Sequence, residues 1–279
     1  MRTPTVLLAL TALALVPGCK KGQETQNPDQ ITTNSDGGTE PDEDVQANKL
    51  PPQDPDPAEL GRLYDRYLAG DYEAVVAGAE ELRAGLTADT QVRAHALAAA
   101  IEALAASENL PEDGQALAEQ AVADGDRLGD PEVQQLAHVA HGVYLVRVHE
   151  AAAGQTELER ALDLAGPYTA LAHLMLGEAH LNQAFGVGES EDKIENPARL
   201  DDARAAYQAA LDNGSDILKA HAHEGLAAIA KYKNDKQAIC EHAQQAENLY
   251  VAAGATDYVR EVPVLLANEG RCKDFKKAK

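Results

Sequence analysis

Tryptophan is absent from this sequence of 279 residues, and phenylalanine and methionine occur only twice each. A hydrophobic core filled mainly by large rings is therefore excluded, and Ala and Leu have to supply most of it. β-Branched residues are sparse after residue 57, and no segment alternates as a half-buried strand does. Helix-favouring Ala, Leu, Glu and Gln dominate instead. The composition predicts an all-α protein whose helices approach one another closely.

Basic residues are also scarce, with 24 Lys and Arg against 46 Asp and Glu and a formal net charge of −22. This balance disfavours nucleic acid as a partner, because contacts to phosphates need Lys and Arg. A basic peptide, a basic protein surface or divalent cations would be attracted. Solubility of a crowded domain is an equally good explanation of the charge.

Motifs of catalysis are missing as well. The sequence has no Gly-x-Ser-x-Gly turn, no phosphate-binding loop and no dinucleotide-binding Gly-x-Gly-x-x-Gly after a strand. Of the nine histidines, His223 begins a His-Glu-x-x-His pattern with Glu224, but Ala227 stands where the second histidine is needed. We therefore expect no enzyme activity, no metal site and no cofactor.

The longest apolar run is short and lies at the start of the chain. Met1-Arg2 precede an apolar stretch from Val6 to Val16, which is too short to span a bilayer comfortably. A charged start, an apolar core and small residues before the break indicate a signal peptide over residues 1–18. An ordinary secreted protein would have the same features.

The stretch Val16-Pro17-Gly18-Cys19 resembles a bacterial lipobox. The resemblance implies cleavage before Cys19 and attachment of acyl chains, such as palmitate, to that residue. Two or more acyl chains would anchor the protein in the bacterial cell envelope. Lys20 follows the cysteine in place of the Asp that retains such proteins at the inner membrane. The resemblance thus favours the outer membrane and leaves open whether the protein faces the periplasm or the cell surface.

Residues 19–57 contain almost no large apolar side chains. Asp42-Glu43-Asp44 repel one another, and the prolines between Pro51 and Pro57 fix the backbone in extended conformations. We expect this segment to be a disordered tether that lifts a folded domain, residues 58–279, away from the lipid. Binding of a basic partner to the acidic run is the alternative.

Helical periodicity and stop signals such as Gly70-Asp71 and Gly129-Asp130-Pro131 divide the rest of the chain into about eleven helices. They are expected near 58–69, 71–85, 90–107, 112–128, 130–149, 155–165, 168–185, 198–213, 215–233, 236–252 and 256–273.

These helices form pairs, and the pairs resemble tetratricopeptide repeats. The motifs that carry the resemblance are Leu60-Gly61 with Tyr64, Leu176-Gly177 with His180, and Ala203 with Tyr207 and Ala210. The resemblance implies an α-solenoid of antiparallel helical hairpins, in which small residues allow close approach and larger ones fill the grooves.

The two remaining cysteines are placed symmetrically. Cys240 lies early in one predicted helix and Cys272 late in the next, at about equal distances from the turn near Ala253–Thr256. Residues equidistant from such a turn face each other, and export places them where disulfides persist. We predict a Cys240–Cys272 disulfide, with two buried thiols as the alternative.

Taken with the resemblance, these features suggest a non-catalytic, membrane-tethered module that binds a protein or peptide as scaffold or accessory of an envelope complex. Tetratricopeptide arrays bind partners through the first helix of each pair. The resulting candidates for the groove are Tyr64, Tyr67, Arg93, Tyr144, His173, His180 and Asn182. The alternative is a solute-binding accessory lipoprotein of a transport system. An apolar pocket with a few convergent polar groups would favour the alternative, and an open solvated groove would favour the interaction module.

Overall fold

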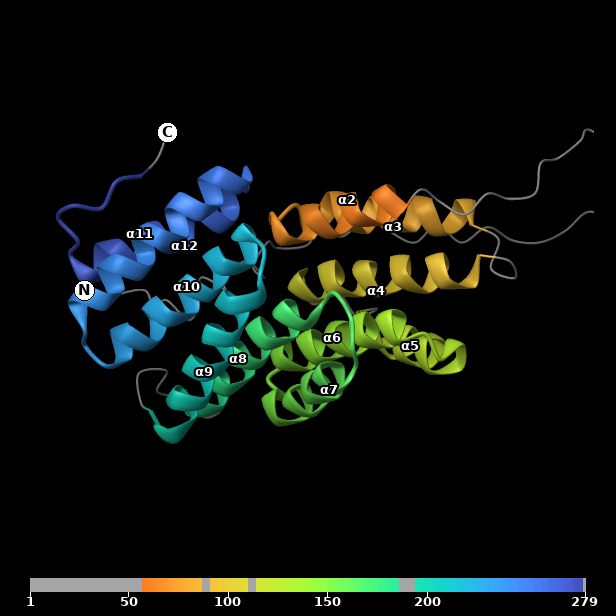
Figure 1. Cartoon of the computed structure of the whole chain (residues 1–279), viewed down its shortest axis with the longest axis horizontal. Coiled ribbons are helices and arrows are strands. Elements are labelled where there is room, and N and C mark those ends of the chain that lie inside the picture. The colour runs from red at the N-terminus through yellow and green to blue at the C-terminus, as the bar shows by residue number, and fades with distance from the viewer. Residues whose placement is uncertain (1–56, 87–90, 110–113, 186–193, 278–279) are drawn as a thin grey trace, which may run out of the picture.

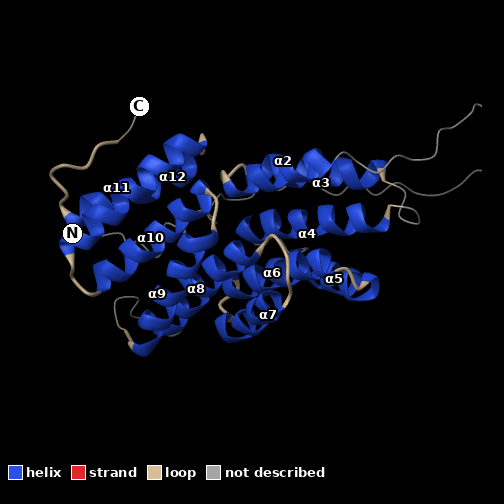
Figure 2. Cartoon of the chain, in the orientation of Figure 1, coloured by secondary structure: helices blue, strands red, loops and turns tan. Residues whose placement is uncertain are grey.

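The computed structural model describes residues 57–86, 91–109, 114–185 and 194–277. These residues form eleven α-helices and no β-strand (Figure 2), which confirms the all-α class. The helices are α2 (Pro57–Leu68), α3 (Tyr72–Gly85), α4 (Val92–Asn109), α5 (Gly114–Leu128), α6 (Pro131–Arg147), α7 (Ala151–Asp163), α8 (Thr169–Phe185), α9 (Ala198–Asn213), α10 (Asp216–Tyr232), α11 (Lys236–Ala253) and α12 (Asp257–Gly270).

Most boundaries lie within two residues of the predicted ones. Helix α7 begins at Ala151, four residues before the expected start, because Gly154 lies inside the helix. Helix α12 ends at Gly270, three residues early, because Arg271 adopts the left-handed conformation that stops a helix. The predicted signal peptide, Cys19 and nearly all of the predicted tether lie outside the described residues.

Each helix packs against the next one in the chain, and the hairpins α6–α7, α8–α9 and α10–α11 make the most extensive contacts. The even-numbered helices α2, α4, α6, α8, α10 and α12 also contact one another in succession. They form a continuous layer, and the odd-numbered helices pack beside it (Figure 1).

Small residues set the distances between helices. A methyl group at Gly142 of α6 would lie 2.7 Å from Leu158 Cγ of α7, and one at Gly154 would lie 2.7 Å from Val146 Cγ2. The two helices therefore meet at glycines that no larger residue can replace without a shift. Gly61, in contrast, faces open space, so its expected role as a packing point is wrong.

Tyr207 of α9 occupies a notch between two neighbouring helices. A methyl group at Gly177 of α8 would lie 2.6 Å from its ring, and one at Gly225 of α10 would overlap it. Tyr207 itself is only 4% exposed. The absence of side chains at these two positions thus lets a ring from α9 reach between α8 and α10.

The turn after α2 contacts the last helices of the chain. The carbonyl of Leu68 lies 3.1 Å from His221 Nε2 of α10. The carbonyl of Ala69 accepts hydrogen bonds from the backbone N–H of Thr256 at 3.2 Å and from its hydroxyl at 2.8 Å. Gly70, with φ of +82°, lies so close to Val259 that a methyl group would be 2.6 Å from it. These contacts, which we call the closure, join the first hairpin to the last.

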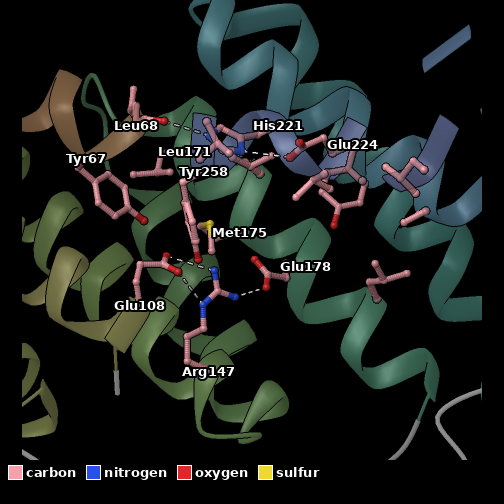
Figure 3. A pocket seen from close by; sticks show the side chains of 18 of the residues that line it. Tyr67, Leu68, Glu108, Arg147, Leu171, Met175, Glu178, His221, Glu224 and Tyr258 are labelled. Atoms are coloured by element: carbon pink, nitrogen blue, oxygen red, sulfur yellow. Dashed lines mark hydrogen bonds and ion pairs between the residues drawn. The ribbon is translucent and has the colours of Figure 1, made fainter. Parts of the chain in front are cut away.

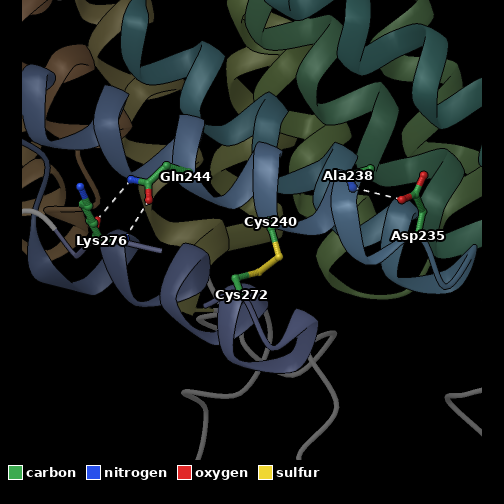
Figure 4. Close-up of a disulfide and its surroundings, with 6 residues drawn as sticks. All are labelled: Asp235, Ala238, Cys240, Gln244, Cys272 and Lys276. Atoms are coloured by element: carbon green, nitrogen blue, oxygen red, sulfur yellow. Dashed lines mark hydrogen bonds between the residues drawn. A yellow bond between two sulfur atoms is a disulfide. The ribbon is translucent and has the colours of Figure 1, made fainter. Parts of the chain in front are cut away.

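The final hairpin is joined covalently. A disulfide links Cys240 of α11 to Cys272 just after α12, with 5.4 Å between the Cα atoms (Figure 4). Beside it, the side chain of Gln244 donates to the carbonyl of Lys276 and accepts from its N–H. A second, small apolar cluster packs this hairpin against α10 and includes Ala227, Ile239, Val262 and Leu266.

Candidate functional site

The even-numbered helices enclose a cavity of about 110 Å³ beneath the closure (Figure 3). All six of these helices contribute to its wall, together with residues from α3 and α9. An engineered apolar cavity of about 150 Å³ is large enough to hold benzene. The present cavity is about a quarter smaller but opens to solvent at Tyr258, so it can hold several waters or a small organic molecule that extends into the opening.

Most of the wall is apolar. On α8, the residues at positions 171, 174, 175, 178 and 181 follow the spacing of one helical face. All of them except Glu178 are apolar. The apolar residues that line the cavity are Leu68, Leu171, Leu174, Met175, Leu181, Ala228, Val259, Val262 and Leu266.

An ion-pair cluster forms the polar part of this wall. Arg147 of α6 donates from Nε and Nη2 to the carboxylate of Glu108, at 3.3 and 3.2 Å, and from Nη1 to Glu178. The three side chains are only 6%, 9% and 13% exposed. Burial opposes the charge of Arg147, but the carboxylates of Glu108 and Glu178 raise its pKa well above the ordinary value. The guanidinium therefore stays charged and holds three helices together.

A second polar group lies where the closure meets α10. His221 Nδ1 lies 2.6 Å from the hydroxyl of Tyr250 and 3.4 Å from Glu224, while Nε2 donates to the Leu68 carbonyl. Burial alone would lower the pKa of His221, but Glu224 and the Leu68 carbonyl together raise it. Burial also raises the pKa of Glu224, against the influence of His221.

Five tyrosines complete the wall, namely Tyr67, Tyr72, Tyr207, Tyr232 and Tyr258. In Figure 3, Tyr67 and Tyr258 point toward the cluster around Arg147. Tyr72 stacks edge-on against Tyr258 with 5.9 Å between the ring centres, and Tyr258 is 41% exposed. Tyr258 thus lies at the boundary between the cavity and solvent.

The structure separates the residues predicted for a partner groove. Tyr67 lines the cavity. Tyr64 packs edge-on against Tyr168 at 5.1 Å, and the charge of exposed Arg93 acts on the same Tyr168. Arg93 itself forms ion pairs with two carboxylates of the α6 N-terminus, of which Asp130 lies at 2.8 Å. Tyr64 and Arg93 therefore belong to one surface region outside the cavity.

The other predicted residues do not line the cavity. His180 is buried and lies 3.4 Å from Arg199 of α9, and burial lowers its pKa. His173, seven residues earlier on the same face of α8, is half-buried, and its pKa is also lowered by burial. Tyr144 and Asn182 are half-buried too. The groove assignment of these residues stays a prediction.

Histidines pair with neighbours outside the cavity as well. His138 Nδ1 lies 2.7 Å from Glu157, and His223 Nδ1 lies 3.0 Å from His242 Nδ1. Burial and the neighbouring His242 lower the pKa of His223 to about 4. Across the described residues, no three His, Cys, Asp or Glu side chains gather in a way that could hold a metal ion.

Sequence reasoning missed the charged residues of the cavity, although a signal for them exists. Glu178 lies in phase with Leu171, Leu174 and Met175, so a carboxylate occupies an otherwise apolar helix face. A charge in phase with a buried stripe is unusual unless it is paired. Its partner Arg147 is 31 residues away in sequence, and local periodicity cannot identify such a pair.

No helix within the described ranges combines the length and the apolar character that crossing a membrane requires. In comparisons with protein-family models, curated proteins and solved structures, the chain matches none.

Proposed function

We propose that the chain is a non-catalytic, lipid-tethered protein of the bacterial cell envelope that binds a small, mostly apolar solute in its central cavity. A tethered protein of this kind would act as an accessory of a transport system. The cavity carries the proposal, because it combines apolar walls with a few convergent polar groups. Such sites are typical of small-ligand binding.

The proposed architecture is a tetratricopeptide-like α-solenoid that closes on itself. Consecutive hairpins pack in chain order, and Ala203, Tyr207 and Ala210 are buried as the repeat pattern requires. Gly177 provides the notch that accepts Tyr207. In an open solenoid the first and last units stay apart, whereas here Ala69 bonds to Thr256. The closure turns the inner face from an open groove into a pocket.

Filling the cavity tests this function. Ala228 lines the cavity and Ala252 is exposed on α11, so Ala228→Phe should occupy the ligand space while Ala252→Phe should not. A panel of small apolar molecules is screened by thermal shift against the full-length protein, and each hit is measured again by calorimetry. We expect hits that Ala228→Phe abolishes and Ala252→Phe leaves unchanged. Absence of hits, or hits that bind Ala228→Phe normally, would overturn the proposal.

The membrane attachment is tested separately. Cells that express the chain are fed an alkyne analogue of palmitate, and the protein is analysed for the label. Cys19→Ser should lose the label and move to the soluble fraction, while the wild-type chain stays with the outer membrane. An unlabelled wild-type chain would contradict lipidation.

Protein or peptide binding is the second candidate, and a groove of about 610 Å³ between α2 and α3 favours it. The carboxylates of Glu59 and Glu81 line this groove together with the guanidinium groups of Arg62 and Arg66, which suits a partner segment that carries charges of both signs. Glu81→Lys should then weaken capture of a partner from membranes. Glu80→Lys, an exposed neighbour that does not line the groove, serves as the control.

A further inference from the structure

The ion-pair cluster around Arg147 does not balance in charge. Arg147 supplies one positive charge to its cluster, whereas Glu108 and Glu178 supply two negative charges. Lys231 also lines the cavity but pairs with Glu269 at 2.7 Å. One negative charge is therefore left in excess in a largely apolar space, where an uncompensated charge is costly.

Three of the five N–H donors of Arg147 are already used. Glu108 accepts from Nε and Nη2, and Glu178 accepts from Nη1. An anionic ligand that approached the remaining donors would face the carboxylates of Glu108 and Glu178 at short range. A cation, in contrast, meets the carboxylates without breaking these bonds, so the geometry favours a positive ligand.

The carboxylates of the cluster also act on the tyrosines of the wall, against the opposing charge of Arg147. Burial raises the pKa of Tyr67 and Tyr72, and the charge of Glu108 raises each further. Burial is the main cause that raises the pKa of Tyr207. The charges of Glu178 and Glu224 raise this pKa further, and the charge of Arg147 lowers it. Aromatic faces attract cations, and the attraction grows when the site is shielded from water.

A carboxylate oxygen on α10 provides an independent sign of a ligand. Glu224 lines the cavity and is 5% exposed. The carboxylate interacts with His221 and Tyr250, but its Oε1 is buried and has no hydrogen-bond partner of its own among the described residues. A buried acceptor without a donor is unfavourable, and a ligand N–H group would satisfy it.

We propose that the solute is a small organic cation, an ammonium group on a compact apolar body, with one end of the molecule at the opening beside Tyr258. The ammonium group would lie near the carboxylates and tyrosine rings, and the body would contact Leu171, Met175 and Val262. This inference rests on the proposed function, because it names the ligand class of the same cavity.

Three ligands of one shape and different charge test the inference. Benzylammonium is positive, benzyl alcohol is neutral and benzoate is negative at pH 7. Calorimetry with the full-length protein should give the highest affinity for benzylammonium, a weaker one for benzyl alcohol and the lowest for benzoate. If none of the three binds, the proposed function fails together with the inference. If benzyl alcohol or benzoate binds as tightly as benzylammonium, the cavity binds solutes but the inference is wrong.

Two variants then place the charge in the cavity. Glu178→Gln keeps the shape and removes the excess charge, so the affinity for benzylammonium should fall roughly tenfold to a hundredfold. The affinity for benzyl alcohol should stay constant. Glu241→Gln removes the same charge from the exposed face of α11 and should change neither affinity. Equal losses in the two variants would show that long-range attraction, and not the cavity, selects the cation, which would overturn the inference.

Because Glu178 is partly buried and paired, a second variant avoids dependence on its folding. Tyr258 is 41% exposed, so Tyr258→Leu should fold normally and remove one aromatic face. We expect several-fold weaker binding of benzylammonium and unchanged binding of benzyl alcohol. An unchanged affinity for benzylammonium would contradict the placement of the ammonium group beside this ring.

Discussion

The two terminal hairpins meet at the closure, but they are stabilised by different means. The last hairpin, α11–α12, has a disulfide and packs with α10 around a second apolar cluster that includes Ile239 and Leu266. The first hairpin, α2–α3, packs less extensively on itself and leaves a polar groove between its helices. Its buried residues belong to the main core of the protein.

This difference indicates which part moves when the cavity opens. The last hairpin keeps its shape through its own contacts, so it offers a fixed surface. The first hairpin depends more on contacts with other units, among them those of the closure. Local opening begins where stabilising contacts are few. We therefore expect a solute to enter by displacement of α2 and α3 from α10 and α12.

The largest effect should come from removing the disulfide, which would make the two hairpins alike. Cys240→Ser with Cys272→Ser releases a loop that spans a sequence separation of 32. On the chain-entropy model the free energy of unfolding falls by roughly 3–4 kcal/mol. Urea titration measures this loss. Unchanged stability would mean that the final hairpin needs no covalent link.

A substitution at the closure should loosen the first hairpin instead. Gly70→Ala places a side chain at positive φ and 2.6 Å from Val259. We expect a loss of about 2 kcal/mol in the free energy of unfolding, together with faster hydrogen exchange in α2 and α3. Gly129→Ala is the matched control, because Gly129 also has positive φ but faces open space. Equal losses would show that backbone strain alone is responsible.

A smaller effect is expected from one hydrogen bond of the closure. Thr256→Val removes the hydroxyl that donates to the Ala69 carbonyl and keeps the backbone bond. The free energy of unfolding should fall by about 1 kcal/mol. Thr156→Val removes an exposed hydroxyl bond within α7 and should have almost no effect in the same urea titration.

The last comparison is a dependence of stability on pH that differs between two histidines of α10. The pKa of His221 is raised in the folded protein, so its contribution to stability is complete below the unfolded value of 6.5 and declines as pH rises through the raised pKa. The pKa of His223 is lowered to about 4, so stability declines as pH falls from about 6.5 toward 4. The free energy of unfolding is measured between pH 4 and 8 for two variants. His221→Gln should lose the decline toward high pH, and His223→Gln should lose the decline toward low pH. Parallel profiles would contradict the assignment.

Much of the helical organisation was accessible from the sequence, because Gly70, Gly129 and Gly254 mark helix ends and adopt positive φ. The pairing of Cys240 with Cys272 follows from their distances to one turn, and the structure contains that disulfide. Helix ends and the pairing across one turn can be predicted because both depend on residues that are close in the sequence.

The closure and the cavity were not accessible in this way. The Ala69–Thr256 hydrogen bond joins residues 187 positions apart, and no local pattern marks either partner. The spacing of Leu171 and Met175 is that of a buried helix face, and only Glu178 on the same face indicates that something polar lies inside. Residues from eight helices line the cavity, and no single motif determines how these helices pack together.

At the closure, the acceptors are the main-chain carbonyls of Leu68 and Ala69. Main-chain groups keep their chemistry when side chains are exchanged, so new lining residues can be introduced without removing these acceptors. The ligand preference of the cavity can accordingly change, by design or in evolution, while the closure between the two ends of the chain is retained.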